Sequence, residues 1–261
     1  MRPLCLLLAV AATLPLRAAE PTQPGVLSYY LDVRVDVDAQ GKVLHVEAPA
    51  DFPEAVRDYV ERRVATWQYL PARENGVAVS ATTWVRVGMC AVPVAEGYRM
   101  GLDFKGNGPG NLSSSTGFWP APKYPLDAQR RDLGGSFTVH FAIQDDGSAK
   151  VTSIDPNDED SRRYLGWFRD GLNAWVAEMH FQPELVNGRP VHTEMKIPVT
   201  FISRAGSSPP TPAERQAESE ARALTSRECL AASLPMGLVP VAQNSPVKVT
   251  PMPEVRAGAG S

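Results

Sequence analysis

Two stretches of this chain, residues 31–38 and 137–144, alternate between apolar and polar residues. A period of two is typical of a strand with one buried face and one face toward water. A glycine turn follows each stretch, at Gly41 and at Gly147, and apolar residues then resume. The pattern therefore predicts a β-hairpin at each place.

A helical period follows each predicted hairpin, with apolar residues along one side of the helix. These residues are Val56, Tyr59, Val60, Val64 and Trp67 in the first copy, and Tyr164, Leu165, Phe168, Leu172, Trp175, Val176 and Met179 in the second. Gly166 and Gly171 each weaken the second helix by about 1 kcal/mol. We therefore expect that helix to depend on burial of its apolar side.

After each helix the chain runs through a proline and an Asn-Gly turn into an apolar strand. Tyr69-Leu-Pro71 matches Phe181-Gln-Pro183, and Asn75-Gly76 matches Asn187-Gly188. Both matches keep one offset (183 − 71 = 112 and 188 − 76 = 112). Chance similarity of two apolar stretches would not readily keep both the order and the spacing, so the sequence indicates a duplicated unit.

The predicted fold class is α+β, with two small β-β-α-β domains, each one helix packed on a three-stranded antiparallel sheet. The first domain is expected over residues 26–92 and the second over residues 121–203. Residues 93–120 contain a stretch rich in glycine, asparagine and serine and are expected to be a linker. Residues 204–261 are expected to be a C-terminal tail, helical at first and then rich in proline and glycine.

The N-terminus has the pattern of a secretory signal peptide. An apolar run from Leu4 to Leu16 follows Arg2, and small residues follow the run at Ala18 and Ala19. We therefore expect residues 1–19 to be cleaved on export. The alternative is a retained membrane anchor, although the run is shorter than the ~20 residues that a membrane-spanning helix needs.

The charge balance argues against nucleic acid as a partner. The chain has 26 basic and 29 acidic residues, a formal net charge of −3, and removal of Arg2 and Arg17 makes the balance more acidic. Of the three cysteines, Cys5 lies within the signal peptide. Cys90 and Cys229 are compatible with a disulfide in an exported protein, the alternative being two unpaired thiols.

The polar residues form no catalytic or metal-binding pattern. The histidines His45, His140, His180 and His192 lack the spacing that brings several ligands together. The acidic residues Asp155, Asp158, Glu159 and Asp160 fit no calcium-binding loop and are expected to form a solvated loop and a helix N-cap. We therefore expect no catalytic residue, metal or cofactor, and the chain is not predicted to be an enzyme. Trp84 and Trp119 stay open between packing and a role as interaction anchors.

The second copy carries a recognisable set of motifs. In order they are Pro122-Lys-Tyr124-Pro125, Gly135-Ser-Phe-Thr-Val-His-Phe, Asp146-Gly147, Phe181-Gln-Pro183, Asn187-Gly188 and Ile197-Pro198-Val199-Thr-Phe201. Their order and spacing resemble the C-terminal domain of TonB, the energy transducer of Gram-negative cell envelopes. The resemblance covers about eighty residues. The first copy matches less completely, because no Tyr-Pro precedes its first strand.

The resemblance implies a peptide-binding function. In the TonB family this domain binds a short segment of an outer-membrane receptor by adding it as a strand, which uses the unpaired N–H and C=O groups of a sheet edge. The corresponding strand here would supply Met195, Lys196, Ile197, Val199 and Phe201 as partner-binding residues. Pro198 within that strand also favours an edge position.

The family's N-terminal membrane anchor and long proline-rich spacer have no counterpart in this sequence. We therefore predict a periplasmic, non-enzymatic protein-interaction module, whose partner is an envelope protein or an extended peptide, with an outer-membrane receptor among the candidates. Two alternatives stay open. One is a TonB-type transport accessory whose retained N-terminus anchors it in the inner membrane, and the other is a cell-wall-binding accessory domain of envelope biogenesis. A homodimer formed by strand exchange is also left open.

Overall fold

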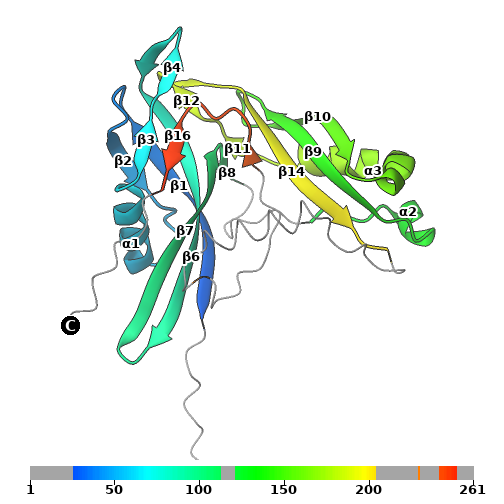
Figure 1. Cartoon of the computed structure of the whole chain (residues 1–261), viewed down its shortest axis with the longest axis horizontal. Helices are drawn as coiled ribbons and strands as arrows, with labels where there is room; N and C mark the ends of the chain where they lie inside the picture. The colour runs from blue at the N-terminus through cyan, green and yellow to red at the C-terminus, as the bar shows by residue number, and fades with distance from the viewer. Residues whose placement is uncertain (1–25, 113–120, 204–228, 230–240, 252–261) are drawn as a thin grey trace, which may run out of the picture.

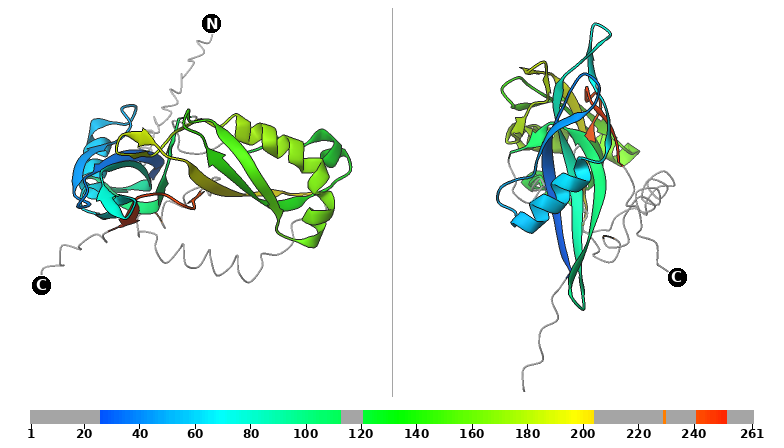
Figure 2. Two further views of the ribbon diagram at one scale, coloured as in Figure 1. Left: turned by 90° about the horizontal axis from the view of Figure 1, so that it is seen from above. Right: turned by 90° about the vertical axis from the view of Figure 1, so that its left-hand side faces the viewer.

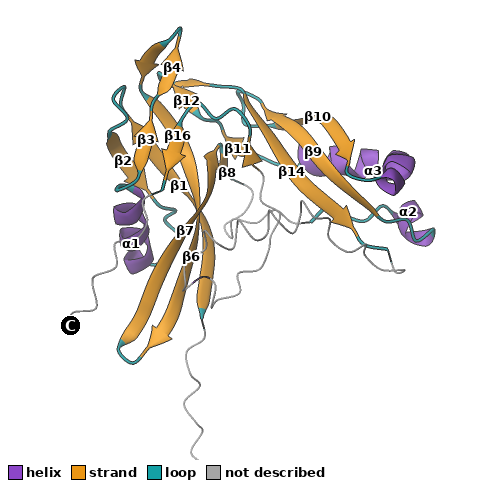
Figure 3. Ribbon diagram, in the orientation of Figure 1, coloured by secondary structure: helices purple, strands orange, loops and turns teal. Residues whose placement is uncertain are grey.

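The computed structural model describes residues 26–112, 121–203, 229 and 241–251, and Figure 1 shows their arrangement. The fold is mixed α+β and consists mostly of strands, with three helices among the described residues (Figure 3). The α+β class expected from the sequence is therefore confirmed. The predicted signal peptide, Trp119 and the predicted helical part of the C-terminal tail, apart from Cys229, lie outside the described residues.

Six antiparallel strands form what we call the first sheet. They are β1 (Leu27–Val37), β2 (Val43–Glu47), β6 (Ala81–Val94), β7 (Gly97–Gly108), β12 (Leu185–Val186) and β13 (Arg189–Pro190). The order is β13-β12-β6-β1-β2, and β7 also pairs with β6. Helix α1 (Glu54–Val64) lies on one face of this sheet (Figure 2).

The first core forms between the first sheet and α1. The inward side chains of β1 are Leu31, Val33, Val35 and Val37, each at most 1% exposed. Val60 and Val64 of α1 are fully buried against them. Each such side chain contributes roughly 1.5–3 kcal/mol on burial, so the alternation that predicted the strand also explains why α1 packs there.

Four antiparallel strands form the second sheet. They are β9 (Gly135–Ile143), β10 (Ala149–Pro156), β14 (Thr193–Phe201) and β15 (Val241–Ala242), in the order β10-β9-β14-β15. Helix α3 (Glu159–Ala177) covers one face, and the short helix α2 (Leu126–Arg130) lies at its side (Figure 2). Phe137, Phe168 and Phe201 lie in ring contact within this second core.

The remaining strands are short and form three two-stranded pairs. They are β3 (Gln68–Leu70), β4 (Ala72–Glu74), β5 (Val77–Val79), β8 (Gly110–Asn111), β11 (Phe181–Gln182) and β16 (Lys248–Thr250). β4 pairs with β5, β11 with β8, and β16 with β3.

No helix within the described ranges has the length and apolar character needed to cross a lipid bilayer.

The two halves impose the same backbone requirements at matching positions. Gly41 and Gly147 both have positive φ, and a Cβ on either would collide with a backbone carbonyl oxygen, of Tyr69 in the first case and Phe181 in the second. The Asn75-Gly76 and Asn187-Gly188 turns both have positive φ at both residues, the conformation of a type I′ turn. The glycine and Asn-Gly signals of the sequence therefore correspond to real steric demands.

Two expectations about the fold are wrong. Neither sheet has three strands, because β7 and the strands β12 and β13 of the second copy join the first sheet, and β15 joins the second. Residues 93–120 are also not a flexible linker over most of their described part, since β7 pairs with β6 from Gly97 to Gly108 and β8 follows. The glycines of this stretch allow unusual backbone angles within paired strands, with φ of 113° at Gly97 and 134° at Gly106. A glycine-rich composition was therefore a poor guide to flexibility here.

The acidic residues before α3 have the structural role that the sequence suggested. The Asp158 carboxylate accepts a hydrogen bond of 2.7 Å from the backbone N–H of Ser161 and caps the helix. Glu159 and Asp160 lie in the first turn, where negative charge is favourable.

Candidate functional site

The residues predicted to bind a partner all lie on β14, but most of their side chains point into the second core. Met195, Ile197, Val199 and Phe201 are between 0% and 7% exposed. Lys196 is only partly buried, on the opposite face of the strand. The four apolar side chains therefore hold β14 on the core, and what the strand offers to a partner is its backbone and its outer face.

One edge of β14 pairs with β9 along the whole strand, and the other edge pairs with β15 over only two residues. Gln243 N–H donates to Glu194 C=O over 2.7 Å, and Glu194 N–H donates to Asn244 Oδ1 over 2.7 Å. Glu194 thus turns its backbone groups toward β15. Because this direction alternates along a strand, Lys196, Pro198 and Thr200 face the same side.

Beyond Lys196, no strand among the described residues pairs with this side of β14. We call this stretch, Ile197–Phe201, the open edge. It presents the C=O of Pro198 and both the N–H and C=O of Thr200. Proline has no N–H, so it is tolerated where a strand's N–H would point to solvent. The position of Pro198 therefore agrees with an unpaired edge.

The corresponding edge of the first sheet is fully paired. At the offset of 112 residues, Pro198 corresponds to Arg86 and Thr200 to Gly88. These β6 residues pair with Gly106 and Asp103 of β7. The chain therefore contains one copy of this edge with an added antiparallel strand and one copy in which no described strand pairs with the same stretch.

The outer face beside the open edge is polar. Ser136 Oγ lies 3.3 Å from Thr200 Oγ1, within hydrogen-bonding distance, and His140 is opposite Lys196 in the strand register. His140 Nε2 lies 3.1 Å from a carboxylate oxygen of Asp155 on β10. A strand added to the open edge would meet hydroxyl and charged groups on this face.

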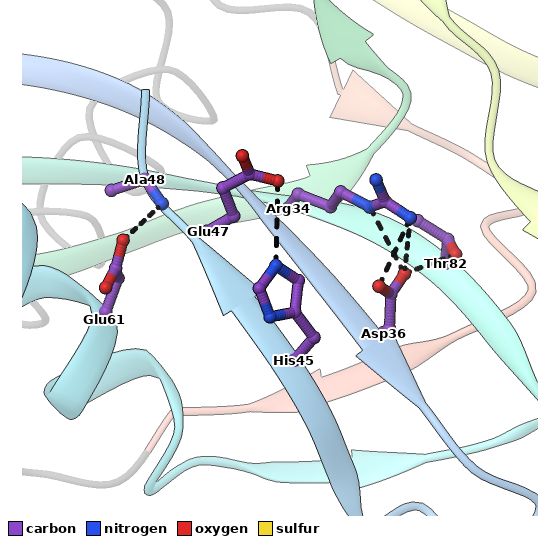
Figure 4. A network of polar contacts seen from close by, with 7 residues as sticks. All are labelled: Arg34, Asp36, His45, Glu47, Ala48, Glu61 and Thr82. Carbon is purple, nitrogen blue, oxygen red and sulfur yellow. Dashed lines mark hydrogen bonds and ion pairs between the residues drawn. The ribbon is translucent and has the colours of Figure 1, made fainter. Parts of the chain in front are cut away.

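A second cluster of polar contacts covers the outer face of β1 and β2 (Figure 4). Arg34 and Asp36 form an ion pair with 3.2 Å between the charged atoms, and Asp36 also accepts from Thr82 of β6. His45 Nε2 lies 3.7 Å from Glu47 Oε2, with both side chains more than half exposed. Exposed pairs of this kind contribute at most about 1 kcal/mol, so this cluster is a solvated sheet face.

The most deeply buried carboxylate lies where the two sheets meet, and the sequence did not reveal it. Glu184 is 0% exposed. Its carboxylate accepts hydrogen bonds from Thr83 (2.6 Å), Thr193 (3.0 Å) and Ser245 (2.7 Å). These three hydroxyls come from β6, from β14 and from the segment before β16, so one side chain joins both sheets and the C-terminal segment 241–251.

Burial raises the pKa of Glu184, and the three hydroxyl hydrogen bonds and the charge of Lys248 oppose that shift only in part. A signal for this residue was present in the repeat. At the offset of 112 residues Glu184 corresponds to Ala72, which is also fully buried. Glu184 therefore takes the place of a buried alanine. An acidic side chain at a buried position needs hydrogen-bond partners, so this exchange would have indicated a polar contact in the interior.

The C-terminal segment is attached to the first sheet at further points. Asn107 Nδ2 donates to Ser245 Oγ over 2.9 Å and to Val247 C=O over 3.0 Å. Cys90 of β6 and Cys229 are joined in a disulfide with 5.1 Å between their Cα atoms. The cysteine pair that the sequence left open is therefore bonded in this structure.

Trp84, which the sequence left open between packing and an anchor, is partly buried on the outer face of β6. Gly110 of β8 lies so close to its indole ring that a Cβ there would collide with it. Within the described ranges no group of three or more His, Cys, Asp or Glu side chains could hold a metal ion.

Searches against protein-family models and curated proteins found no match to this chain.

Proposed function

We propose that this protein is an exported, non-enzymatic interaction module of the Gram-negative cell envelope, built from two β-β-α-β units that resemble the C-terminal domain of TonB. Its second unit binds an extended segment of an envelope protein, with outer-membrane receptors among the candidates, by adding that segment as a strand to β14. The observation that carries the proposal is the open edge at Ile197–Phe201, beside a corresponding edge that β7 occupies in the first sheet.

The same comparison supports a direction for the added strand. β7 runs antiparallel to β6, so a segment bound in the same way would run antiparallel to β14. Its last paired residue would then lie opposite Ile197, because β15 occupies the place opposite Lys196. Backbone hydrogen bonds contribute about 0.5–1.5 kcal/mol each, so a short added strand binds weakly unless its side chains find further contacts.

A matched pair of variants at Thr200 tests this proposal. Thr200→Pro removes the outward N–H and places a ring carbon at the edge, while the β9 side of the strand keeps its hydrogen bonds. Thr200→Ala keeps the N–H and removes only the exposed hydroxyl. Peptides selected from a displayed random library on the full chain should bind Thr200→Pro roughly tenfold more weakly, as expected for about 1.4 kcal/mol, and Thr200→Ala almost unchanged.

Equal binding to Thr200→Pro and to the unmodified chain would overturn strand addition at β14. A loss with both variants would assign the interaction to the hydroxyl rather than to the backbone. Self-association that disappears in Thr200→Pro would identify a second copy of this chain as the occupant.

The location of the protein in the envelope is tested separately. Mass spectrometry of the mature N-terminus should find a chain that begins close to Ala19, as expected after signal-peptide cleavage. A mature protein that keeps Met1 and Leu4–Leu16 would instead support the anchored, energy-transducing alternative.

A further inference from the structure

A cavity of about 230 Å³ lies along β7 at the junction of the two sheets. Its walls come from Asp32 of β1, from β6, from β7, from Met195 of β14 and from the C-terminal segment. β15 and β16 both lie against β7 here, and in Figure 1 the two halves of the molecule adjoin beside β8 and β11. Ligand pockets are commonly roughly 300–1,000 Å³, so this one suits a small molecule.

Arg86 gives the cavity a buried cation with unused donors. The side chain is 7% exposed. Its Nε donates to Asp32 Oδ1 over 2.7 Å, and its Nη2 donates to Asp32 Oδ2. Among the described residues its Nη1 has no hydrogen-bond partner. A guanidinium has five N–H donors in a planar fork, so one side of the fork remains available at the cavity wall.

Asp32 is the one carboxylate among the residues that line this cavity, and it is already satisfied. In addition to the Arg86 contacts, its Oδ2 accepts from the backbone N–H of Asn111 over 2.8 Å. The carboxylate therefore holds the guanidinium in place, and these donors compensate its negative charge.

Lys105 adds a second cation from an irregular point of β7. Gly106 pairs with Arg86 and Phe104 with Val87, so Lys105 is an extra residue in a β-bulge. Bulges redirect side chains and are frequent beside binding sites. Lys105 Nζ lies 3.4 Å from an oxygen of Asp103, and a Cβ on the neighbouring Gly106 would meet only open space.

Lys248 of β16 supplies a third cation at the wall, and no ion pair involving it occurs among the described residues. The rest of the lining is largely apolar, with Trp84, Phe104, Met195, Val241 and Val249. Asp32 holds Arg86 and Asp103 holds Lys105, and the charge of Lys248 acts on Glu184. The unused donors of Arg86 and the unpaired Lys248 are therefore what favours an anion, and the planar fork of Arg86 suits a carboxylate. The apolar walls favour a ligand that also carries an apolar group.

We propose that this junction cavity binds a small organic carboxylate with an apolar side group, of about the size of an acylated amino acid. The site differs from the open edge of β14, so the strand-addition proposal can fail without affecting it.

The test uses the full chain with its disulfide formed, and N-acetylvaline as the probe. Amide chemical shifts are followed by NMR during titration, with the neutral N-acetylvalinamide as the matched probe. N-acetylvaline should shift the amides of Gly106 and Gly108 and the indole N–H of Trp84 saturably, and the neutral amide should not. The variant with Lys105→Ala and Lys248→Ala should bind at least about tenfold more weakly, since it lacks two of three cations.

Lys150 is exposed on β10, so Lys150→Ala is the control for loss of a positive charge. This variant should bind N-acetylvaline as the unmodified chain does. The double variant must keep the remaining amide spectrum, which shows that it is folded. The proposal is overturned if N-acetylvaline produces no saturable shift, if acid and amide shift the same signals equally, or if the double variant binds unchanged. Saturable shifts confined to β14 would equally contradict it.

Discussion

The corresponding edges of β6 and β14 differ in what covers them. β6 carries β7 from Trp84 to Val94, whereas β14 carries the two-residue strand β15 and is then open among the described residues. The difference follows from chain connectivity. β7 follows β6 through a two-residue turn, so closing the pair costs little chain entropy. β15 lies forty residues beyond the end of β14 (241 − 201 = 40).

The comparison shows that the same edge is covered by a strand in one copy, while in the other copy no described strand pairs with it beyond Lys196. The inner face of β7 contributes Leu102 and Phe104 to the first core, and Phe104 contacts Trp67 in an edge-to-face arrangement with 5.6 Å between the ring centres. No described strand does this beside Val199 or Phe201 on the open edge. An added peptide would therefore bring its own side chains to that place.

Removing the disulfide should have the largest effect. Cys90 and Cys229 are 139 residues apart, and a loop of that order corresponds to about 2–5 kcal/mol of stabilisation. We expect Cys90→Ala to lower the urea midpoint accordingly and to speed hydrogen exchange of the Lys196 amide, which faces β15. Cys229→Ala and the double variant should lose no more than Cys90→Ala. Additive losses would contradict the idea that both cysteines act only through their bond.

Shortening a side chain of β7, the strand that pairs with the edge of β6, should have the next largest effect. Leu102 is 9% exposed and packs on the first core, so Leu102→Ala should cost about 2–4 kcal/mol in urea unfolding. Val241 of β15 is 43% exposed, and Val241→Ala should cost less than about 0.5 kcal/mol. Comparable costs for the two variants would mean that β15 covers β14 as firmly as β7 covers β6.

The buried Glu184 predicts a dependence of stability on pH at the junction. Its pKa is raised above the ordinary value of 4.5 by burial. Above pH 4.5 this carboxyl group is therefore protonated in a larger fraction of folded molecules than of unfolded molecules. The free energy of unfolding should therefore decrease as the pH rises from 4.5 through the raised pKa, and then stay level with respect to this group.

Urea unfolding at a series of pH values gives the slope of the free energy of unfolding against pH. Glu184→Gln should remove the part of this slope that comes from Glu184. Glu194→Gln, at an exposed position of β14, is the matched control and should leave it. An unchanged slope in Glu184→Gln would show that other groups determine the pH dependence.

Completing the open edge should have the smallest effect. Pro198→Val adds an N–H donor that points away from β9, and one more hydrogen bond is worth about 0.5–1.5 kcal/mol. Peptides that bind the edge should then bind about threefold to tenfold more tightly in a titration. Thr200→Val leaves the number of N–H groups unchanged and should not have this effect. Weaker binding to Pro198→Val would mean that the proline itself contacts the ligand.

Much of the local structure could be predicted because it depends on residues close together in the chain. The alternation around Val33 and Val139 placed strands, and the apolar side around Val60 and Leu172 placed helices. Asp158 caps its helix as predicted. The glycine turns could be predicted because only a residue without a Cβ fits beside the carbonyl oxygens of Tyr69 and Phe181.

The candidate site could be predicted only in part. Pro198 indicated an edge, and the edge beyond Lys196 is open among the described residues. The side chains chosen with it are mostly buried, because alternate residues of an edge strand still face the core. Glu184 and the cavity beside Arg86 were missed, because their partners come from segments far apart in the sequence.

The sequence by itself determined the two repeats of strand, turn, helix and strand, and the steric need for glycine and Asn-Gly at their turns. Only the tertiary structure decided which sheet edge is covered. A strand's N–H and C=O groups pair with whichever backbone reaches them in space, and composition does not encode that choice. The glycine-rich residues expected to link two domains therefore became β7, and β14 kept an open edge.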